Sequence, residues 1–110
     1  MDNRDFDIQI LRGDAAQGRI HWHQHALERF LERWISRAEV VSAIMDGEVI
    51  EVYSTDRPYS SCLILYVEAK PVQVVAAADP IARICHVITA YRPELEHFEP
   101  DFKTRKRKTS

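Results

Sequence analysis

The sequence predicts an α+β fold in which two N-terminal helices pack on a four- to five-stranded, mainly antiparallel sheet. Three observations predict this fold class. Apolar residues recur at helical spacing over residues 23–46, β-branched residues dominate four short runs after residue 47, and short turns separate those runs. Helices followed by closely connected strands are typical of a two-layer domain with the helices on one face of the sheet.

The N-terminal quarter carries the weakest pattern. Residues 1–18 are mostly polar, and the alternation of Ile8 and Ile10 predicts a short strand or an extended arm. Residues 19–22 are expected to form a second short extended piece. The first helix is predicted over residues 23–34, where five apolar residues share one arc of the helix: Ala26, Leu27, Phe30, Leu31 and Trp34.

A start signal marks the second helix. Ser36 and Glu39 form a capping box, in which the serine hydroxyl accepts from the Glu39 N–H and the glutamate side chain bonds back. Val40, Val41, Ile44 and Met45 give this helix its apolar face. Gly47 is expected to end it, because glycine reaches the left-handed conformation at little steric cost.

Strands are predicted over residues 48–53, 62–67, 72–77 and 83–91, with a loop at 54–60 that is long enough to face a ligand. On the last strand, alternation places His86 on one face with Ile88 and Ala90, as a core histidine. A short docking helix is expected over residues 94–102. The predicted core between helices and sheet comprises Leu27, Phe30, Leu31, Val40, Ile44, Leu63, Leu65, Val74 and Val87.

Charge is unevenly distributed along the chain. Residues 103–110 carry five basic groups, which leaves ten basic and seventeen acidic groups, a net charge of −7, in residues 1–102. We expect residues 1–102 to form a single domain and residues 103–110 to form a basic tail that either is simply solvated or binds RNA phosphates. A body this acidic argues against strong nucleic-acid binding by the body itself.

The length and position of the apolar runs bear on the location of the protein and on the redox state of its cysteines. No run approaches the ~20 residues of a membrane helix, and the acidic N-terminus is unlike a signal peptide, so we expect a cytoplasmic protein that does not contact membranes. Cys62 and Cys85 lie inside apolar runs. In a reducing compartment they are expected to be buried thiols rather than a disulfide.

Histidine and arginine supply the candidate chemistry. His25, Arg29 and Arg33 line one side of the first predicted helix, where an imidazole and two guanidinium groups suit metal-independent cleavage of RNA. The alternative is an ordinary charged helix surface, with Glu28 and Glu32 as ion-pair partners. His21, His23 and His25 alternate and would point one way on an extended segment. Without a thiolate or second histidine pair we expect structural or surface histidines, no metal and no cofactor.

Several segments together resemble a known family. They are HALERFLER at 25–33, GEVIE at 47–51, RPYSSCL at 57–63 and TAYRP at 89–93. In this order and spacing, about residues 20–93 resemble the bacterial domain family of unknown function numbered 4258. Members of that family look like small toxins of toxin–antitoxin pairs, some encoded beside a zinc-finger antitoxin, and their element order resembles the RelE-like, microbial ribonuclease-like fold.

The resemblance implies a site and a function. It implies a toxin-type endoribonuclease that has RNA as its substrate and a zinc-finger antitoxin as its partner. Whether the protein forms a homodimer is left open. The implied catalytic residues are His25, Arg29, Arg33 and Tyr91, and the implied substrate-binding residues are Arg57, Ser61, Gln73, Thr89 and Arg92.

Two departures from the family pattern bear on that function. Trp34 stands where glycine is common, and Gln73, which cannot exchange protons, stands where histidine is common. The competing hypothesis is therefore a non-catalytic protein-interaction domain that retains the same fold.

Overall fold

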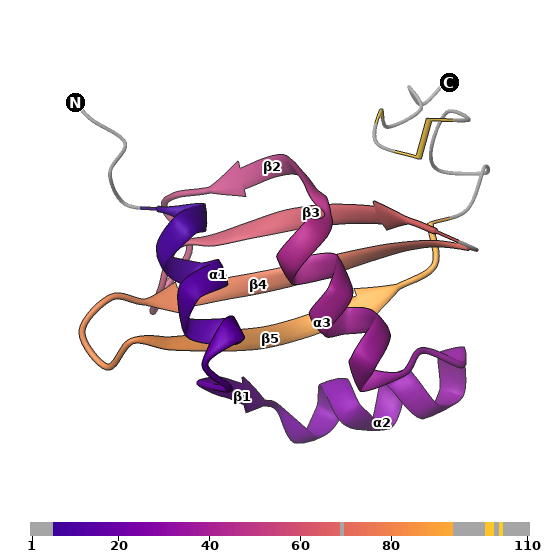
Figure 1. Ribbon diagram of the computed structural model, residues 1–110, viewed down its shortest axis with the longest axis horizontal. Coiled ribbons are helices and arrows are strands. Elements are labelled where there is room, and N and C mark those ends of the chain that lie inside the picture. Colours follow the sequence, from indigo (N-terminus) through magenta and orange to yellow (C-terminus); the bar gives the residue numbers. More distant parts are fainter. Residues whose placement is uncertain (1–5, 69, 94–100, 103, 105–110) are drawn as a thin grey trace.

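One five-stranded sheet with helices along it makes up the fold (Figure 1). The structure, a computed structural model, describes residues 6–68, 70–93, 101, 102 and 104. Its elements are α1 (Ile8–Ala16), β1 (Ile20–Trp22), α2 (Gln24–Arg33), α3 (Arg37–Asp46), β2 (Glu48–Tyr53), β3 (Ser61–Val67), β4 (Pro71–Asp79) and β5 (Ile84–Tyr91).

The strands follow the order β1-β5-β4-β3-β2. β2 to β5 form the predicted antiparallel meander, with Cys62 of β3 opposite Ala76 of β4. β1 is different, because it pairs in parallel with β5, placing His21 opposite His86. The sheet is therefore mixed, and its fifth strand is the short piece expected at residues 19–22.

The prediction of a strand or extended arm near Ile8 and Ile10 was wrong, and residues 6–68 contain three helices rather than the two predicted there. The Asp7 carboxylate caps α1 by accepting from the backbone N–H of Gln9 at 2.9 Å. Leu11, Asp14 and Ala15 form the buried face at helical spacing. The capping aspartate and this i, i+3, i+4 spacing describe the segment better than the alternation of two isoleucines.

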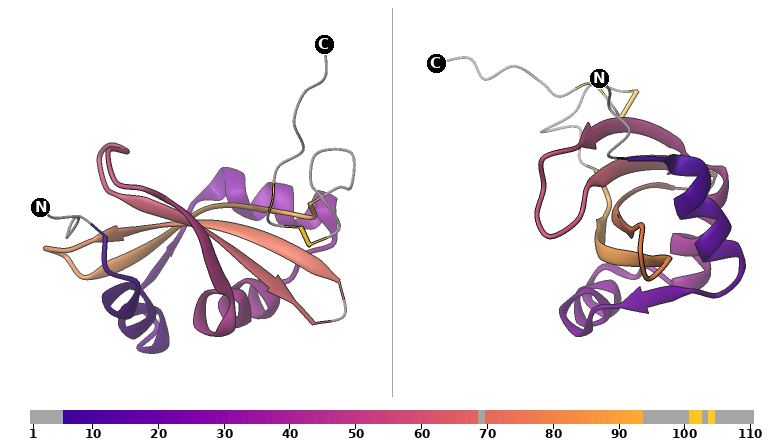
Figure 2. Two further views of the ribbon diagram at one scale, coloured as in Figure 1. Left: turned by 90° about the horizontal axis from the view of Figure 1, so that it is seen from above. Right: turned by 90° about the vertical axis from the view of Figure 1, so that its left-hand side faces the viewer.

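The helices α1 and α3 cover one face of the sheet, as both views of Figure 2 show. The core lies between this helical layer and the sheet, with Leu11, Ile44, Ile64, Val74 and Val87 among its fully buried side chains. Of the predicted core residues, Phe30, Val40, Ile44, Leu63, Leu65, Val74 and Val87 are buried. The two-layer prediction is confirmed for α3, and α1 completes the layer.

The helix α2 packs along the edge of the sheet, against β5. Ala26 and Phe30 are buried and Leu27 is half-buried, but the Leu31 side chain is 81% exposed. Placing Leu31 in the core was wrong, because a helix at a sheet edge buries a narrower stripe than one lying flat on a sheet. Leu63 and Leu65 are buried, but on the face of β3 opposite to Cys62 and Ile64 of the core.

Trp34 ends α2 in a left-handed conformation, with φ 57° and ψ 45°. The Ile35 N–H then donates to the Phe30 carbonyl at 3.0 Å, which closes the helix as a glycine cap would. The family's glycine position is thus occupied by a bulky residue in the same backbone conformation. Its side chain is 89% exposed.

We predict that Trp34→Gly raises the free energy of unfolding by about 0.5–1 kcal/mol. Glycine removes the steric cost of the left-handed conformation, and little apolar burial is lost. Urea denaturation of both proteins measures the difference. A less stable Trp34→Gly protein would contradict the prediction, because it would mean that the indole packs on the fold.

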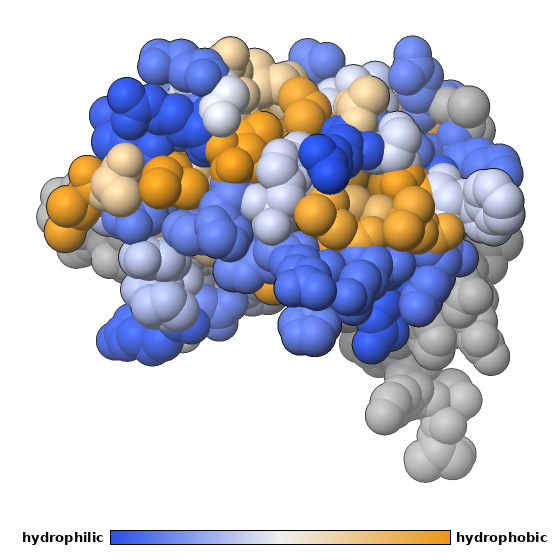
Figure 3. All heavy atoms as spheres, turned by 90° about the horizontal axis from the view of Figure 1, so that it is seen from below, coloured by the Kyte–Doolittle hydropathy of each residue, from blue (hydrophilic) through white to orange (hydrophobic). Residues whose placement is uncertain are grey.

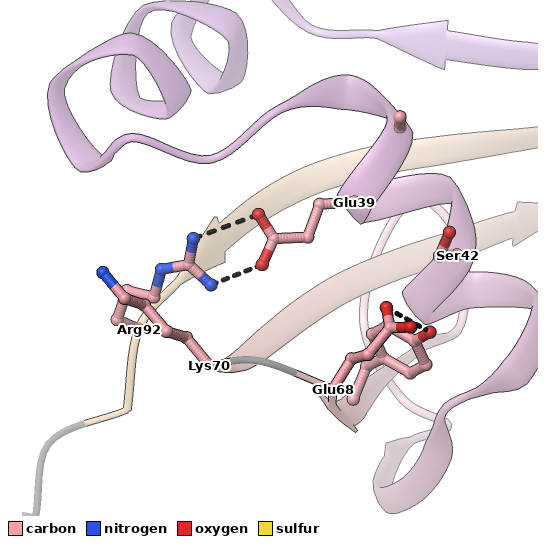
Figure 4. Close-up of a pocket in the computed structure, with 7 residues that line it drawn as sticks. Glu39, Ser42, Glu68, Lys70 and Arg92 are labelled. Atoms are coloured by element: carbon pink, nitrogen blue, oxygen red, sulfur yellow. Dashed lines mark hydrogen bonds and ion pairs between the residues drawn. The ribbon is translucent and has the colours of Figure 1, made fainter.

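The start of α3 was predicted in part. Ser36 Oγ accepts from the Glu39 N–H at 3.0 Å, as expected. The Glu39 carboxylate does not bond back to Ser36. It forms a two-pronged ion pair with Arg92, whose two terminal nitrogens lie 2.5 and 3.0 Å from its oxygens (Figure 4). Arg92 also donates to the carbonyls of Pro71 and Trp34. One side chain after β5 therefore links the α2–α3 junction to the start of β4.

Gly47 ends α3 as predicted, but the predicted reason, a left-handed backbone conformation, was wrong. Gly47 has φ −77° and ψ 173°, which any residue adopts. Glycine is required there by space, because a Cβ would lie 2.5 Å from the Ala43 carbonyl oxygen and 2.8 Å from that of Leu65. Arg12 of α1 also binds this end of α3, because it donates to the carbonyls of Ile44, in the last turn, and of the cap residue Gly47.

An irregularity in β5 changes which residues share a face. Val75 pairs with Thr89 but Ala76 pairs with Val87, so Ile88 is an extra residue in the strand. Val87 and Ala90 therefore both face the core, and the predicted grouping of Ala90 with His86 was wrong. The face of the sheet away from α1 and α3, here called the far face, carries Ser61, Gln73, Val75, His86 and Thr89.

The remaining sequence predictions concern the thiols and the termini. Cys62 and Cys85 are buried and unbonded, as expected, and burial raises the pKa of each to about 12. The helix expected over 94–102 lies outside the described residues except for Asp101 and Phe102, and the basic tail lies outside them except for Thr104. Among the described helices, none has both the length and the apolarity to cross a membrane.

Candidate functional site

Three histidines meet at the edge of the far face, two from the segment around β1 and one from the distant strand β5. Parallel pairing sets His21 of β1 beside His86 of β5, and their ring centroids are 5.3 Å apart. His23 follows two residues later, with its ring 4.4 Å from His21. The closest contact joins His23 Nε2 and His86 Nδ1, which are 3.4 Å apart. The predicted alternation is thus confirmed for His21 and His23.

The helix boundary decides which histidines join this cluster. His23 is the N-cap of α2, with extended backbone and no hydrogen bond from its side chain to the helix. His25 lies inside α2, where the chain no longer alternates. Its side chain is 96% exposed and lies 3.6 Å from Glu28. His86, expected to be a satisfied core histidine, instead lies half-buried on the far face, and its buried Nε2 has no partner among the described residues.

The β2–β3 loop closes over this cluster from the other side. Tyr59 stacks on His86 with the ring planes 14° apart and the centroids separated by 5.0 Å. Ser61 Oγ donates to Asp56 at 2.6 Å, which folds the loop back on β3. The result is a pocket of about 190 Å³. It is lined by His23, Asp56, Arg57, Pro58, Tyr59, Ser61, Val75, Ala77, His86 and Ile88.

The turn after β4 anchors Tyr59. Asp79 Oδ1 accepts from the backbone N–H groups of Ile81 and Ala82, each at 3.0 Å. The N–H of Ala82, with help from Ile81 and Tyr59, lowers the pKa of Asp79. The hydrogen bond to that carboxylate in turn raises the pKa of Tyr59. Tyr59 is thus held between a carboxylate that stays ionised and the ring of His86.

The two touching imidazoles favour the neutral form. Burial lowers the pKa of His23, and the nearby His21 lowers it further. For His86, burial lowers the pKa most, His21 and His23 add to the effect, and Asp79 opposes it. A pair of neutral imidazoles in contact can accept one proton and share it through a hydrogen bond between the two rings.

We predict that folding stability falls as pH drops below 6.5. The folded pKa values of His23 and His86 lie below the usual 6.5, so the unfolded chain takes up protons first. This stability contribution is complete above pH 6.5 and is lost as pH falls through the folded values. Melting temperatures at pH 7.5, 6.5 and 5.5 measure it. The double variant His23→Asn/His86→Gln should show a flatter dependence, and an unchanged slope would contradict the assignment.

The structure distributes the sequence-predicted site residues over several places. Arg57 and Ser61 line the histidine pocket. Arg33 Nη1 donates to the Ala90 carbonyl at 2.8 Å and lies 3.5 Å from Thr89 Oγ1, which brings these two predicted residues together beside the far face. His25 and Arg29 lie on the exposed side of α2, separate from the pocket.

Three further predicted residues lie at the other end of β5: Gln73 and Tyr91 on the far face, and Arg92 on the side of α3. Gln73 pairs with Tyr91 across β4 and β5. The Gln73 side chain is fully buried, its Nε2 donates to the Phe102 carbonyl at 2.6 Å, and its Oε1 has no partner among the described residues. Arg92 is occupied by Glu39, as described above. The sequence interpretation missed His23, Tyr59 and Asp79 as a set, and only the His21–His23 alternation pointed toward them.

Metal binding is not indicated by the described side chains. In the part of the chain that the structure describes, no group of three or more histidine, cysteine, aspartate and glutamate residues is arranged to hold a metal ion. The chemistry available in the histidine pocket is proton transfer by imidazole, hydrogen bonding by Tyr59, and charge from Arg57 at the exposed rim.

Fold and site together define a small α+β protein with a histidine-lined pocket on the sheet face opposite its helices. Residues 22–92 match the family described as Domain of unknown function (DUF4258), and the chain belongs to that family. The match starts at the last residue of β1 and ends just after β5, so it contains β2 to β5 together with α2 and α3. No curated protein and no solved structure matches the chain.

Proposed function

We propose that this protein is a toxin-type endoribonuclease that cleaves RNA without a metal at the histidine pocket. The observation that carries the proposal is the contact of His23 with His86, both with lowered pKa, beside the exposed cation of Arg57. Cleavage of this kind needs a base for the 2′-hydroxyl proton, an acid for the leaving oxygen and a cation for the phosphate.

Each part can be assigned to a residue. His23 is the base, because it lines the pocket and touches His86, which orients it and shares the proton. His21, whose ring centroid lies 4.4 Å from that of His23, is the neighbouring imidazole for protonating the leaving 5′-oxygen. Arg57 binds the phosphate through its planar fork. His25, the base implied by the family resemblance, remains the competing assignment, and the test in the Discussion separates the two.

The family resemblance supports the same proposal and extends it. The resemblance is to toxins of toxin–antitoxin pairs, so a zinc-finger antitoxin is the partner that it implies, and the proposal places both proteins in the cytoplasm. The test is incubation of purified protein, freed of any partner, with a long single-stranded RNA in the presence of a chelator. Products ending in 2′,3′-cyclic phosphate are expected. A folded protein that cleaves none of several RNAs would contradict the proposal.

A second candidate function is a non-catalytic interaction domain, favoured by an apolar groove beside α2. Leu31 is 81% exposed and borders a groove of about 210 Å³ that also includes Leu27 and Ile35. Figure 3 views the molecule from the side on which α2 lies in Figure 1, and apolar side chains gather in its right-hand half. Contiguous exposed apolar surface of this kind often marks a protein-binding site. Failure of RNA cleavage would move the assignment to this function.

A further inference from the structure

A second pocket lies at the opposite end of β5 from the histidines. It has a volume of about 370 Å³ and is lined by Arg33, Trp34, Lys70, Pro71, Arg92 and Pro93, with Phe102 at its edge. Its members come from the end of α2, the start of β4 and the end of β5. We call it the Trp34 pocket.

The Trp34 pocket is positively charged on an acidic body. Glu39 neutralises Arg92 through the two-pronged ion pair. Neither Arg33 nor Lys70 forms an ion pair with a carboxylate of the described residues, so both charges remain available to a ligand. Lys70 lies beside Arg92 (Figure 4), and both residues line the Trp34 pocket. The uncompensated charge is therefore about +2, whereas residues 1–102 as a whole carry −7.

Trp34 gives this basic pocket an aromatic surface. Its indole is 89% exposed, and its backbone is held at φ 57°, where a glycine would fit without strain. A large exposed aromatic residue kept in a costly conformation points to a function for the side chain. An indole beside Arg and Lys charges that no carboxylate of the described residues neutralises is the combination that stacks a base and binds the adjoining phosphate in single-stranded nucleic acid.

The Trp34 pocket connects with the histidine pocket along β5. Arg33, which lines the first, lies 3.5 Å from Thr89 on the far face. Thr89 is paired with Val75, which lines the histidine pocket. His86 and Tyr91 lie opposite Ala77 and Gln73, which are four residue steps apart on β4, or about 13 Å of extended chain. A single strand bound at Trp34 can thus continue along β5, past the half-buried Thr89 and the exposed Ile88, toward His23.

We propose that the Trp34 pocket binds one nucleotide of single-stranded RNA, with its base stacked on Trp34 and its phosphate held by Arg33 and Lys70. This inference rests on the proposed ribonuclease function and assigns it a substrate class and a binding site separate from the reacting groups. Duplex RNA does not fit the arrangement, because its bases are stacked on one another and offer no free face to the indole.

The test measures binding without cleavage. A fluorescently labelled single-stranded oligonucleotide of 2′-O-methyl uridine has no free 2′-hydroxyl, so it binds but does not react. Anisotropy titrations with wild-type protein should show binding that weakens with salt, and the indole fluorescence should be quenched. Trp34→Gly, which relieves the left-handed strain and keeps the fold, should weaken binding about 5- to 100-fold.

Matched charge variants locate the phosphate contact. Lys70→Met should lower the slope of log affinity against log salt by about 0.7. Arg19→Met removes the same charge from an exposed position outside the pocket and should leave the slope unchanged. Unaltered affinity in Trp34→Gly, or equal slopes in the two charge variants, would overturn the inference. Failure of the folded wild-type protein to bind the oligonucleotide would also overturn the inference. That result is expected if Trp34 contacts a protein partner instead.

The result of this binding test can be distinguished from the result of the cleavage test of the proposed function. Binding that depends on Trp34 in a protein that cleaves no RNA would support this inference and contradict the ribonuclease. Cleavage that proceeds equally well in Trp34→Gly at limiting RNA would support the ribonuclease and overturn the inference.

Discussion

His23→Asn is expected to reduce RNA cleavage about 10²- to 10⁴-fold, which is the contribution of a positioned general base. The asparagine amide can replace the imidazole in the contact with His86 but cannot exchange protons near neutral pH. Asparagine is also a favoured N-cap residue, and the His23 side chain makes no capping hydrogen bond to α2, so the fold should be retained. Initial rates on a single-stranded RNA, with circular dichroism as a check on folding, measure the effect.

His25→Ala is the matched control, two residues further along the same helix. Its side chain is 96% exposed and contacts only Glu28 among the groups described here. The proposed mechanism expects nearly wild-type cleavage from His25→Ala and a large loss from His23→Asn. The reverse pattern would place the chemistry on the outer side of α2 with Arg29, as the family resemblance implies, and would contradict the histidine pocket as the reacting site.

Ile44→Ala should lower the free energy of unfolding by about 2–5 kcal/mol. Ile44 is fully buried between α3 and the sheet, and truncation removes apolar contact and leaves a cavity. Since a domain of this size is stable by only about 5–15 kcal/mol, the loss is a large share of the total. The midpoint and slope of urea denaturation measure it.

Leu31→Ala provides the comparison for this core variant. The sequence pattern places Leu31 and Ile44 in the same core, but the structure leaves Leu31 81% exposed. Leu31→Ala is therefore expected to change the free energy of unfolding by no more than about 0.5 kcal/mol. Equal destabilisation by the two substitutions would contradict the position of α2 at the edge of the sheet.

The parts of the fold that could be predicted are those set by local patterns. The four strands of the meander and the two helices around Ser36 depend on neighbouring residues, so their spacing identifies them. The parallel pairing of β1 with β5 depends on residues far apart in the chain, and nothing near Ile20 indicates it. The extra residue at Ile88 likewise follows from the fit of β5 to β4, which a strict alternation does not contain.

The candidate site was predicted less well than the fold, for a related reason. The alternation of His21, His23 and His25 is visible in the sequence, but helix α2 begins at Gln24 and removes His25 from the series. A shift of one residue in a helix boundary, which sequence patterns do not resolve, decides which imidazole faces the pocket. Tyr59 and Asp79 come from a loop and a turn, whose positions depend on the assembled sheet.

The family match and the folded unit do not begin at the same place. The match starts at Trp22, whereas Arg12 donates to the carbonyls of Ile44 and Gly47 at the end of α3, and buried Asp14 pairs with Arg83 at 3.0 Å. Both side chains belong to α1, which also covers part of the core through Leu11. A fragment trimmed to the matched region would lose one wall of its core, a helix cap and His21 together. Expression of residues 22–92 of this chain alone should therefore yield insoluble or partly folded material, and at least the segment from Asp7 onward belongs in the smallest fragment of this protein that can be studied on its own.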